Sequence, residues 1–258
     1  MNKLEKLFAG KTKTLFMAHM IAGYPTIADS EKVAEALAKG GADIIELQIP
    51  FSDPMADGPA IAVASDEVIK AGATVAKSLA LLEKVAKLGK PMAVMTYVNI
   101  AFRYDIPKFV KTIAKAGASA LIVPDCPFDT EEGRELLSAC KENDVFLIPV
   151  VSPGVPKERL EVLARDSRGF VYCTSRQGIT GANSKFAKEL FDFVKELKEV
   201  FNLPIAVGFG VKSKEDVAEL AKIADIVIAG SVFVNVIKNA RDKDPAQIIE
   251  KTVRRLVS

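Results

Sequence analysis

The feature that most constrains this chain is the regular alternation of short apolar runs with longer amphipathic segments. Eight runs rich in β-branched and other apolar residues are predicted as strands: Thr14–Met20, Ile44–Ile49, Met92–Tyr97, Ala120–Val123, Phe146–Val150, Gly169–Cys173, Ile205–Gly208 and Ile226–Ala229. Segments with helical periodicity lie between and after them: Ser30–Lys39, Pro107–Ala116, Thr130–Glu142, Lys157–Ala164, Lys185–Val200, Ser213–Lys222 and Pro245–Leu256. Strands without a polar face that alternate with helices indicate a parallel sheet with helical crossovers.

The number of strand–helix units selects between two α/β architectures. Eight units in 258 residues favour a closed (β/α)8 TIM barrel, and the alternative is an open doubly wound sheet. No Pro/Ser-rich linker and no low-complexity tract divides the chain, so we expect residues 1–258 to form a single TIM-barrel domain. In such a barrel the chemistry lies on the loops that follow the C-terminal ends of the strands.

Charge and cysteine content exclude several classes of function. The chain has 35 Lys and Arg against 33 Asp and Glu, and this balance argues against a dedicated nucleic-acid-binding protein. No apolar run reaches the roughly 18 to 20 residues of a membrane span, and the first residues are too charged for a secretory signal. Cys126, Cys140 and Cys173 are widely spaced and odd in number, which argues against a disulfide framework or a zinc site. We therefore expect a cytoplasmic protein without a metal.

The second strand carries the most unusual residue in an apolar run. Glu46 interrupts the segment Ile44–Ile49, and strand alternation places it on the same face as Gln48. If that face points into the barrel, desolvation raises the pKa of Glu46 and makes it a usable proton donor. The following loop adds Asp53 and Asp57, and two carboxylates in different environments can divide acid and base roles. The alternative is that Glu46 pairs with a rim lysine while the aspartates cap turns.

The residues from Glu46 to Pro59 read Glu-Leu-Gln-Ile-Pro-Phe-Ser-Asp-Pro-Met-Ala-Asp-Gly-Pro and closely resemble the signature of the tryptophan synthase α subunit family. The likeness continues at residues 95–99, 123–127, 175–182, 207–211 and 230–231. It implies a lyase of tryptophan biosynthesis that cleaves indole-3-glycerol phosphate to indole and glyceraldehyde 3-phosphate by a retro-aldol reaction without a cofactor. It also implies that Glu46 is the acid–base residue at indole C3 and the adjacent hydroxyl, and that Asp57 is the partner of the indole N–H.

A phosphate site is expected at the loops that follow the last two predicted strands. Gly210 and Gly230 follow the last two strands, and Ser231 begins a segment, Ser231–Asn239, with helical character. Glycine turns and helix N-termini offer backbone N–H groups to a dianion, although each glycine taken alone can be a simple turn former. The resemblance adds Gly181 to this set.

Aromatic residues and a polar loop complete the expected substrate site. Tyr97, Tyr172 and Phe209 lie at or near strand ends, and the resemblance favours them as indole contacts over plain core residues. The segment Gln177–Lys185 is rich in glycine and polar residues, as a lid that excludes water would be. In the family this loop closes over the substrate, so Thr180 is expected to contact a catalytic carboxylate. The alternative is an ordinary exposed connection.

The resemblance further implies a partner. Members of the family work with a β subunit that carries pyridoxal phosphate, usually as an α2β2 assembly, and indole passes to it through a tunnel. The loop that holds Asp57 belongs to the expected docking surface, so Asp53 and Pro54 are candidates for coupling partner binding to activity. The alternative is a stiff loop without a switching role.

This chain departs from the common family form at several positions. Gln48 stands where glycine is common, Ile21 where threonine is common and Ile100 where proline is frequent, while Ala60 and Ala62 replace polar residues. Gln48 can hydrogen-bond Glu46 or crowd the site. None of these departures removes a catalytic group.

Three further hypotheses remain beside an α subunit. A self-sufficient lyase would release indole without a partner, and a catalytically weak chain would serve only to activate a β subunit. Another phosphosugar barrel is the third, although a Schiff-base aldolase needs a lysine at a strand end and none of the eight predicted ends offers one. His19, the single histidine, is expected to be a buried structural residue, as a lone histidine at a strand end usually is.

Overall fold

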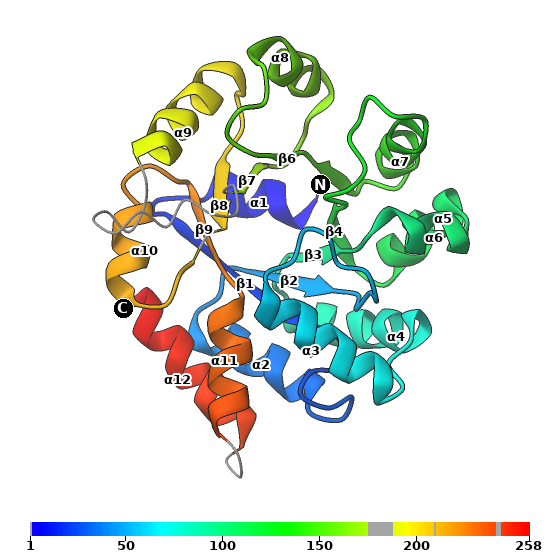
Figure 1. Ribbon diagram of the computed structural model, residues 1–258, viewed down its shortest axis with the longest axis vertical. Helices are drawn as coiled ribbons and strands as arrows, with labels where there is room; N and C mark the ends of the chain where they lie inside the picture. Colours follow the sequence, from blue (N-terminus) through cyan, green and yellow to red (C-terminus); the bar gives the residue numbers. More distant parts are fainter. Residues whose placement is uncertain (1, 175–187, 209, 241–243) are drawn as a thin grey trace.

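Nine parallel strands surround a central axis in the computed structural model, which describes residues 2–174, 188–208, 210–240 and 244–258 (Figure 1). The strands are β1 (Leu15–Ile21), β2 (Ile44–Gln48), β3 (Met92–Met95), β4 (Ala118–Ile122), β5 (Phe146–Ile148), β6 (Val150–Val151), β7 (Val171–Thr174), β8 (Ile205–Gly208) and β9 (Ile226–Ala229). Their order in the sheet is β5-β4-β3-β2-β1-β9-β8-β7-β6. Only Pro149, which has no backbone N–H, separates β5 from β6, so these two are parts of one strand. Because β5 pairs with β4 and β6 with β7, the sheet closes and the predicted eight-stranded barrel is confirmed.

Helices form the outer ring in Figure 1. The described helices are α1 (Lys3–Ala9), α2 (Ser30–Gly40), α3 (Pro59–Lys70), α4 (Val75–Val85), the 3-10 turn η1 (Ala86–Leu88), α5 (Val98–Tyr104), α6 (Ile106–Lys115), α7 (Glu131–Glu142), α8 (Lys157–Asp166), α9 (Lys188–Val200), α10 (Lys214–Leu220), α11 (Ser231–Ala240) and α12 (Pro245–Val257). The long gap after the second strand holds α3 and α4, which were not predicted from the sequence. Pro59 opens α3, and the Thr74 hydroxyl caps α4 by accepting from the N–H of Lys77.

Side chains that point inward form a core inside the barrel. Met17, Ile44, Ala93 and Ile228 belong to this inner cluster, whereas neighbours of opposite parity such as Leu47 pack toward the helices. Leu4 of α1 is fully buried in the inner cluster, away from the mouth of the barrel. The face of β2 that points into the barrel therefore carries Ile44, Glu46 and Gln48, which strand alternation places on one side of the strand.

The last helix packs against α2 and completes the ring. This contact depends on Gly40, because a Cβ atom there would lie 2.6 Å from Cβ of Val253. Gly41 then ends α2 in the left-handed conformation at φ 114°, a position that glycine adopts without strain.

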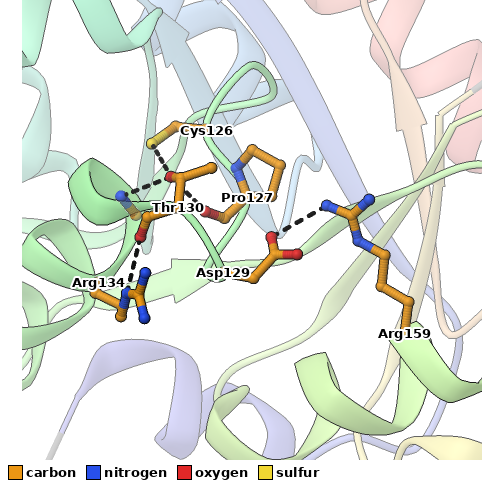
Figure 2. A network of polar contacts seen from close by, with 7 residues as sticks. Cys126, Pro127, Asp129, Thr130, Arg134 and Arg159 are labelled. Carbon is orange, nitrogen blue, oxygen red and sulfur yellow. Dashed lines mark hydrogen bonds and ion pairs between the residues drawn. The ribbon is translucent and has the colours of Figure 1, made fainter.

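A polar network braces the loop between β4 and α7 (Figure 2). The Thr130 hydroxyl donates to the carbonyl of Pro127 at 2.9 Å and accepts from the N–H of Gly133 at 3.0 Å. Asp129 pairs with Arg159 of α8 at 3.0 Å, which ties this loop to the neighbouring unit. These contacts hold a βα loop in place at the face of the barrel where the site lies.

The described residues can be compared with the expectations about disulfides, membrane spans and metal sites. All three cysteines are buried and free, and burial raises the pKa of Cys140 and of Cys173 to about 12. Within the described ranges, no helix combines the length and apolar character that crossing a membrane requires. The described residues also contain no group of three or more His, Cys, Asp or Glu side chains arranged to hold a metal ion.

Candidate active site

A cavity of about 310 Å³ opens at the C-terminal ends of the strands. Its lining includes six residues predicted for the site from sequence: Glu46, Asp57, Tyr172, Gly210, Gly230 and Ser231. Thr180, Gly181 and Phe209 lie outside the described residues. The cavity therefore lies where a barrel places its chemistry, and it brings both candidate carboxylates to one space.

Glu46 projects into the barrel from β2 and is 2% exposed. The parallel register places it opposite His19 of β1, and the Oε1 atom of Glu46 lies 3.3 Å from Nδ1 of His19. The other carboxylate oxygen, Oε2, has no hydrogen-bond partner among the described residues. One oxygen of Glu46 thus has a protein partner, while the second is buried without one in a residue that lines the cavity.

The neighbouring carboxylates set the charge of His19. Burial favours the neutral imidazole, but Glu46, with smaller contributions from Asp57 and Gln48, outweighs this effect and raises the pKa of His19 above its ordinary value. The expectation that His19 is only a buried structural residue therefore misses its contact with the candidate acid–base group. A signal was present in the sequence, because His19 and Glu46 both interrupt apolar strands that are neighbours in a barrel.

Gln48 contacts the second carboxylate rather than the first. Its Nε2 atom donates to Oδ2 of Asp57 at 2.6 Å, so the possible bond from Gln48 to Glu46 is replaced by one to Asp57. Burial raises the pKa of Asp57 above its ordinary value, although Gln48, His19 and Tyr97 act in the opposite direction. Asp57 is only partly buried because it lies on the loop after β2 rather than on the strand itself.

Tyr97, which follows β3 and directly precedes α5, supports that loop. Its hydroxyl accepts the N–H of Ala56 at 3.1 Å, and its ring stacks on Phe51 with 5.1 Å between ring centres. Burial and the nearby Asp57 raise the pKa of Tyr97, which keeps the phenol protonated. The ring is not among the residues that line the cavity, and its contacts are with the loop that carries Asp57.

The two candidate coupling residues lie in the same loop. The carbonyl of Pro54 accepts the N–H of Asp57 at 3.2 Å. Asp53 is exposed and accepts the Ser52 hydroxyl at 2.5 Å. A shift of the exposed part of this loop would therefore act on Asp57 through the backbone.

The opposite wall of the cavity carries the aromatic and phosphate candidates. Tyr172 extends from β7 and packs closely against Gly208. A Cβ atom added at Gly208 would lie only 2.8 Å from the hydroxyl oxygen of Tyr172. Gly210 adopts the left-handed conformation at φ 59°, and Gly230 precedes Ser231, the first residue of α11. Burial and the two carboxylates raise the pKa of Tyr172 well above its ordinary value, so its phenol stays neutral.

Several lining residues were not predicted as site residues from the sequence. They include His19, Met95, Thr174 and Val211. Apart from His19, these residues resemble ordinary strand or loop positions, and their place at the cavity follows from the closure of the barrel.

Comparison with known proteins places the chain in one family. The family model described as tryptophan synthase alpha chain matches residues 6–256. The tryptophan synthase alpha chain of Halalkalibacterium halodurans is 38% identical over 268 residues, covering 100% of both chains, and that of Desulforapulum autotrophicum is 40% identical, covering 87% of this chain and 88% of the relative.

Solved structures agree in fold along almost the whole chain. Tryptophan synthase from M. tuberculosis in its aminoacrylate-bound form matches with a TM-score of 0.88 at 30% identity, covering 99% of this chain and 98% of the matched chain. Tryptophan synthase subunit alpha from Legionella pneumophila matches with a TM-score of 0.89 at 30% identity, covering 99% and 97%. The chain therefore belongs to the tryptophan synthase alpha chain family, the lyases of tryptophan biosynthesis that cleave indole-3-glycerol phosphate.

Proposed function

We propose that this chain cleaves indole-3-glycerol phosphate in the cavity at the barrel mouth, with Glu46 and Asp57 in separate roles. The carbon–carbon bond breaks when indole C3 gains a proton and the adjacent glycerol hydroxyl loses one. The free Oε2 atom of Glu46 is suited to both transfers, because it faces no competing donor among the described residues. Asp57 accepts the indole N–H and offsets the positive charge that develops on the ring.

The observation that carries this proposal is that the two carboxylates share one cavity but have different partners. Glu46 is held by the His19 ring at 3.3 Å, whereas Asp57 accepts from Gln48 at 2.6 Å. Carboxylates in different environments can perform different proton chemistry at one pH. The lining contributed by Ile61, Met95 and Ile122 gives the indole ring an apolar surface between them.

The phosphate group is proposed to bind at Gly210, Gly230 and Ser231. These residues lie at the cavity after β8 and β9, and α11 begins at Ser231 with its first N–H groups free of helical bonding. Glycines at these positions let the backbone approach an anion closely. Gly181, with Thr180 and Phe209, completes the proposed binding set by resemblance.

We also propose that the reaction needs no cofactor and that the chain works with a tryptophan synthase β subunit as α2β2 in the cytoplasm. Proton transfers between oxygen and carbon are within the reach of carboxylates alone. The pyridoxal phosphate of the complete enzyme would then belong to the partner. Residues 1–258 are proposed to act as one domain, since all described strands join one sheet.

The face around the cavity offers a surface for such a partner. Met55, in the loop after β2, is 87% exposed, and Phe102, in the helix after β3, is 66% exposed. Since β2 and β3 are neighbours in the sheet, these large apolar side chains rise from adjacent units on the βα side of the barrel. Asp53 and Pro54 lie beside Met55, which supports their proposed role in coupling.

The test is the release of indole and glyceraldehyde 3-phosphate from indole-3-glycerol phosphate, measured with and without a β subunit. Glu46→Gln is expected to lower kcat at least about 100-fold, and Asp57→Asn at least about tenfold. Glu83→Gln and Asp66→Asn, the matched changes of carboxylates on the outer helices, leave kcat unchanged. Full activity without the partner would instead favour a self-sufficient lyase, and no release in any condition would leave only a role in activating the β subunit.

A further inference from the structure

We propose that His19 and Gln48 are positioning residues, His19 for Glu46 and Gln48 for Asp57, and that they set the geometry of the two carboxylates. This inference rests on the proposed function, because it assigns a task to the residues that surround the two reacting groups. Neither residue belongs to the set expected to touch the substrate. Each nevertheless points into the barrel from a strand, at a depth where apolar side chains such as Met17 and Ile44 fill the neighbouring positions.

The first contact, between His19 and Glu46, joins β1 to β2. His19 and Glu46 are register partners, so the backbone itself places the imidazole beside the carboxylate. The 3.3 Å separation between Nδ1 and Oε1 leaves Oε2 as the oxygen that can reach a ligand. Replacement of His19 by an apolar residue would leave both oxygens of a buried carboxylate without a partner, and Glu46 could rotate away from its working position.

The second contact, between Gln48 and Asp57, joins β2 to the loop that follows it. Gln48 hydrogen-bonds Asp57 through Nε2 at 2.6 Å, whereas Oε1 of Gln48 and Nε2 of His19 have no hydrogen-bond partner among the described residues. Each carboxylate is thus held by its own polar neighbour, Glu46 by His19 and Asp57 by Gln48. The Gln48 amide also contributes to the raised pKa of His19.

This arrangement has a consequence for charge. Two carboxylates that face one cavity repel each other, and a charged imidazole next to them reduces that repulsion. Among the residues that the structure describes, the titratable groups facing His19 are Glu46 from β2, Asp57 from the following loop and the neutral Tyr172 from β7, while Gly230 and Ser231 add none from the β9 side. As the pH rises through the elevated pKa of His19, the proton is lost, the hold on Glu46 weakens and kcat falls.

His19 is the single histidine of the chain, so its imidazole can be observed without overlap. We would titrate the full-length protein by imidazole NMR, in the wild type and in Glu46→Gln, Gln48→Met and Met20→Leu. The pKa of His19 is expected above 6.5 in the wild type, to fall clearly in Glu46→Gln, to fall less in Gln48→Met, and to be unchanged in Met20→Leu, where the side chain packs toward the helices. A wild-type value at or below 6.5, or one that Glu46→Gln does not move, would overturn the inference.

Kinetics supply a second measurement. His19→Phe is expected to lower kcat at least tenfold with KM changed less than threefold, and to remove the fall of kcat at alkaline pH. His19→Asn, which keeps an N–H donor near Glu46 but does not titrate, recovers part of the rate without that fall. A His19→Phe enzyme with the wild-type kcat and pH profile contradicts the proposal.

The two tests also separate this inference from the proposed function. If the wild type releases no indole, the proposed function fails, yet the NMR titration still shows whether His19 is coupled to Glu46. If His19→Phe does not fold, His19→Asn and the wild-type titration decide the matter without it.

Discussion

The Gln48 amide donates a 2.6 Å hydrogen bond to the carboxylate of Asp57, and this contact fastens a loop to the strand that precedes it. Gln48 has no exposed surface, whereas the loop around Asp57 contains exposed residues. A buried amide thereby fixes a carboxylate at the edge of the cavity. The contact needs the long amide side chain of Gln48, which a residue without a donor at this position could not replace.

Replacing Gln48 by methionine is expected to lower kcat/KM about tenfold. A hydrogen bond to a charged group contributes about 1.5–3 kcal/mol, and the methionine side chain fills the same space without a donor. Leu47→Met, a change of similar volume on the opposite face of β2, is the control and keeps the wild-type value. Steady-state kinetics with indole-3-glycerol phosphate provide the measurement, and equal kcat/KM for the Gln48 variant and the wild type would show that the bond is dispensable.

Tyr97→Phe is expected to move the acid side of the kcat/KM profile to higher pH. Asp57 must be ionised to accept the indole N–H, and its pKa is already raised by burial, so activity falls as the pH drops through a value above that of an ordinary aspartate. The Tyr97 hydroxyl lowers that pKa, and its removal raises it further. The ring still stacks on Phe51. Tyr104→Phe, on α5, is the matched control and leaves the profile in place.

Gly133→Ala is expected to destabilise the fold by about 2–4 kcal/mol in urea unfolding. A Cβ atom at Gly133 would lie 1.9 Å from the carbonyl oxygen of Pro127, so the braced loop of Figure 2 would have to move. Gly10→Ala meets no atom closer than 3.8 Å and is expected to change stability by less than about 0.5 kcal/mol. Similar urea midpoints for the two variants would contradict this account of the loop.

Asp225→Asn is expected to lower stability by about 1–2 kcal/mol at neutral pH. Burial opposes ionisation of Asp225, but Lys11 at 2.5 Å, the N–H of Ile205 at 3.1 Å and Lys198 lower its pKa below the ordinary value. A depressed pKa stabilises the folded chain above the ordinary aspartate pKa, and this contribution disappears as the pH falls through the folded value. Unfolding of both proteins at pH 7, 5 and 3 should therefore show a difference that is constant from pH 7 to 5 and smaller at pH 3.

Met55→Asp is expected to weaken binding of a β subunit at least tenfold. An isolated exposed apolar residue is common, but Met55 lies on the loop proposed for docking, and a carboxylate there would need to be desolvated in an interface. Calorimetric titration of the two subunits measures the effect. Val162→Asp, at a half-exposed apolar residue on the distant α8, is the control, and equal affinities for both variants would place the partner elsewhere.

Strand periodicity was sufficient to predict the barrel, because each strand is apolar on both faces and each helix has one apolar face. Strand limits differ from the prediction by a few residues, as at β4, where Ala118 and Ser119 already belong to the strand. The helices α3 and α4 were not assigned, although Pro59 at the start of α3 and Gly72 and Thr74 before α4 are helix start and stop signals in the sequence. The division of one predicted strand into β5 and β6 reflects Pro149 and could have been inferred from that residue.

The sequence by itself determined the class of fold and the inward face of β2, and it predicted the two carboxylates that line the cavity, because these depend on local alternation and on a long contiguous motif. Tertiary structure alone decided the partners of those carboxylates. Glu46 meets His19 because β1 and β2 are in register, and Asp57 meets Gln48 and Tyr97 because the loop folds back over the barrel mouth. Contacts of this kind depend on strand register and loop path, which residue spacing does not specify.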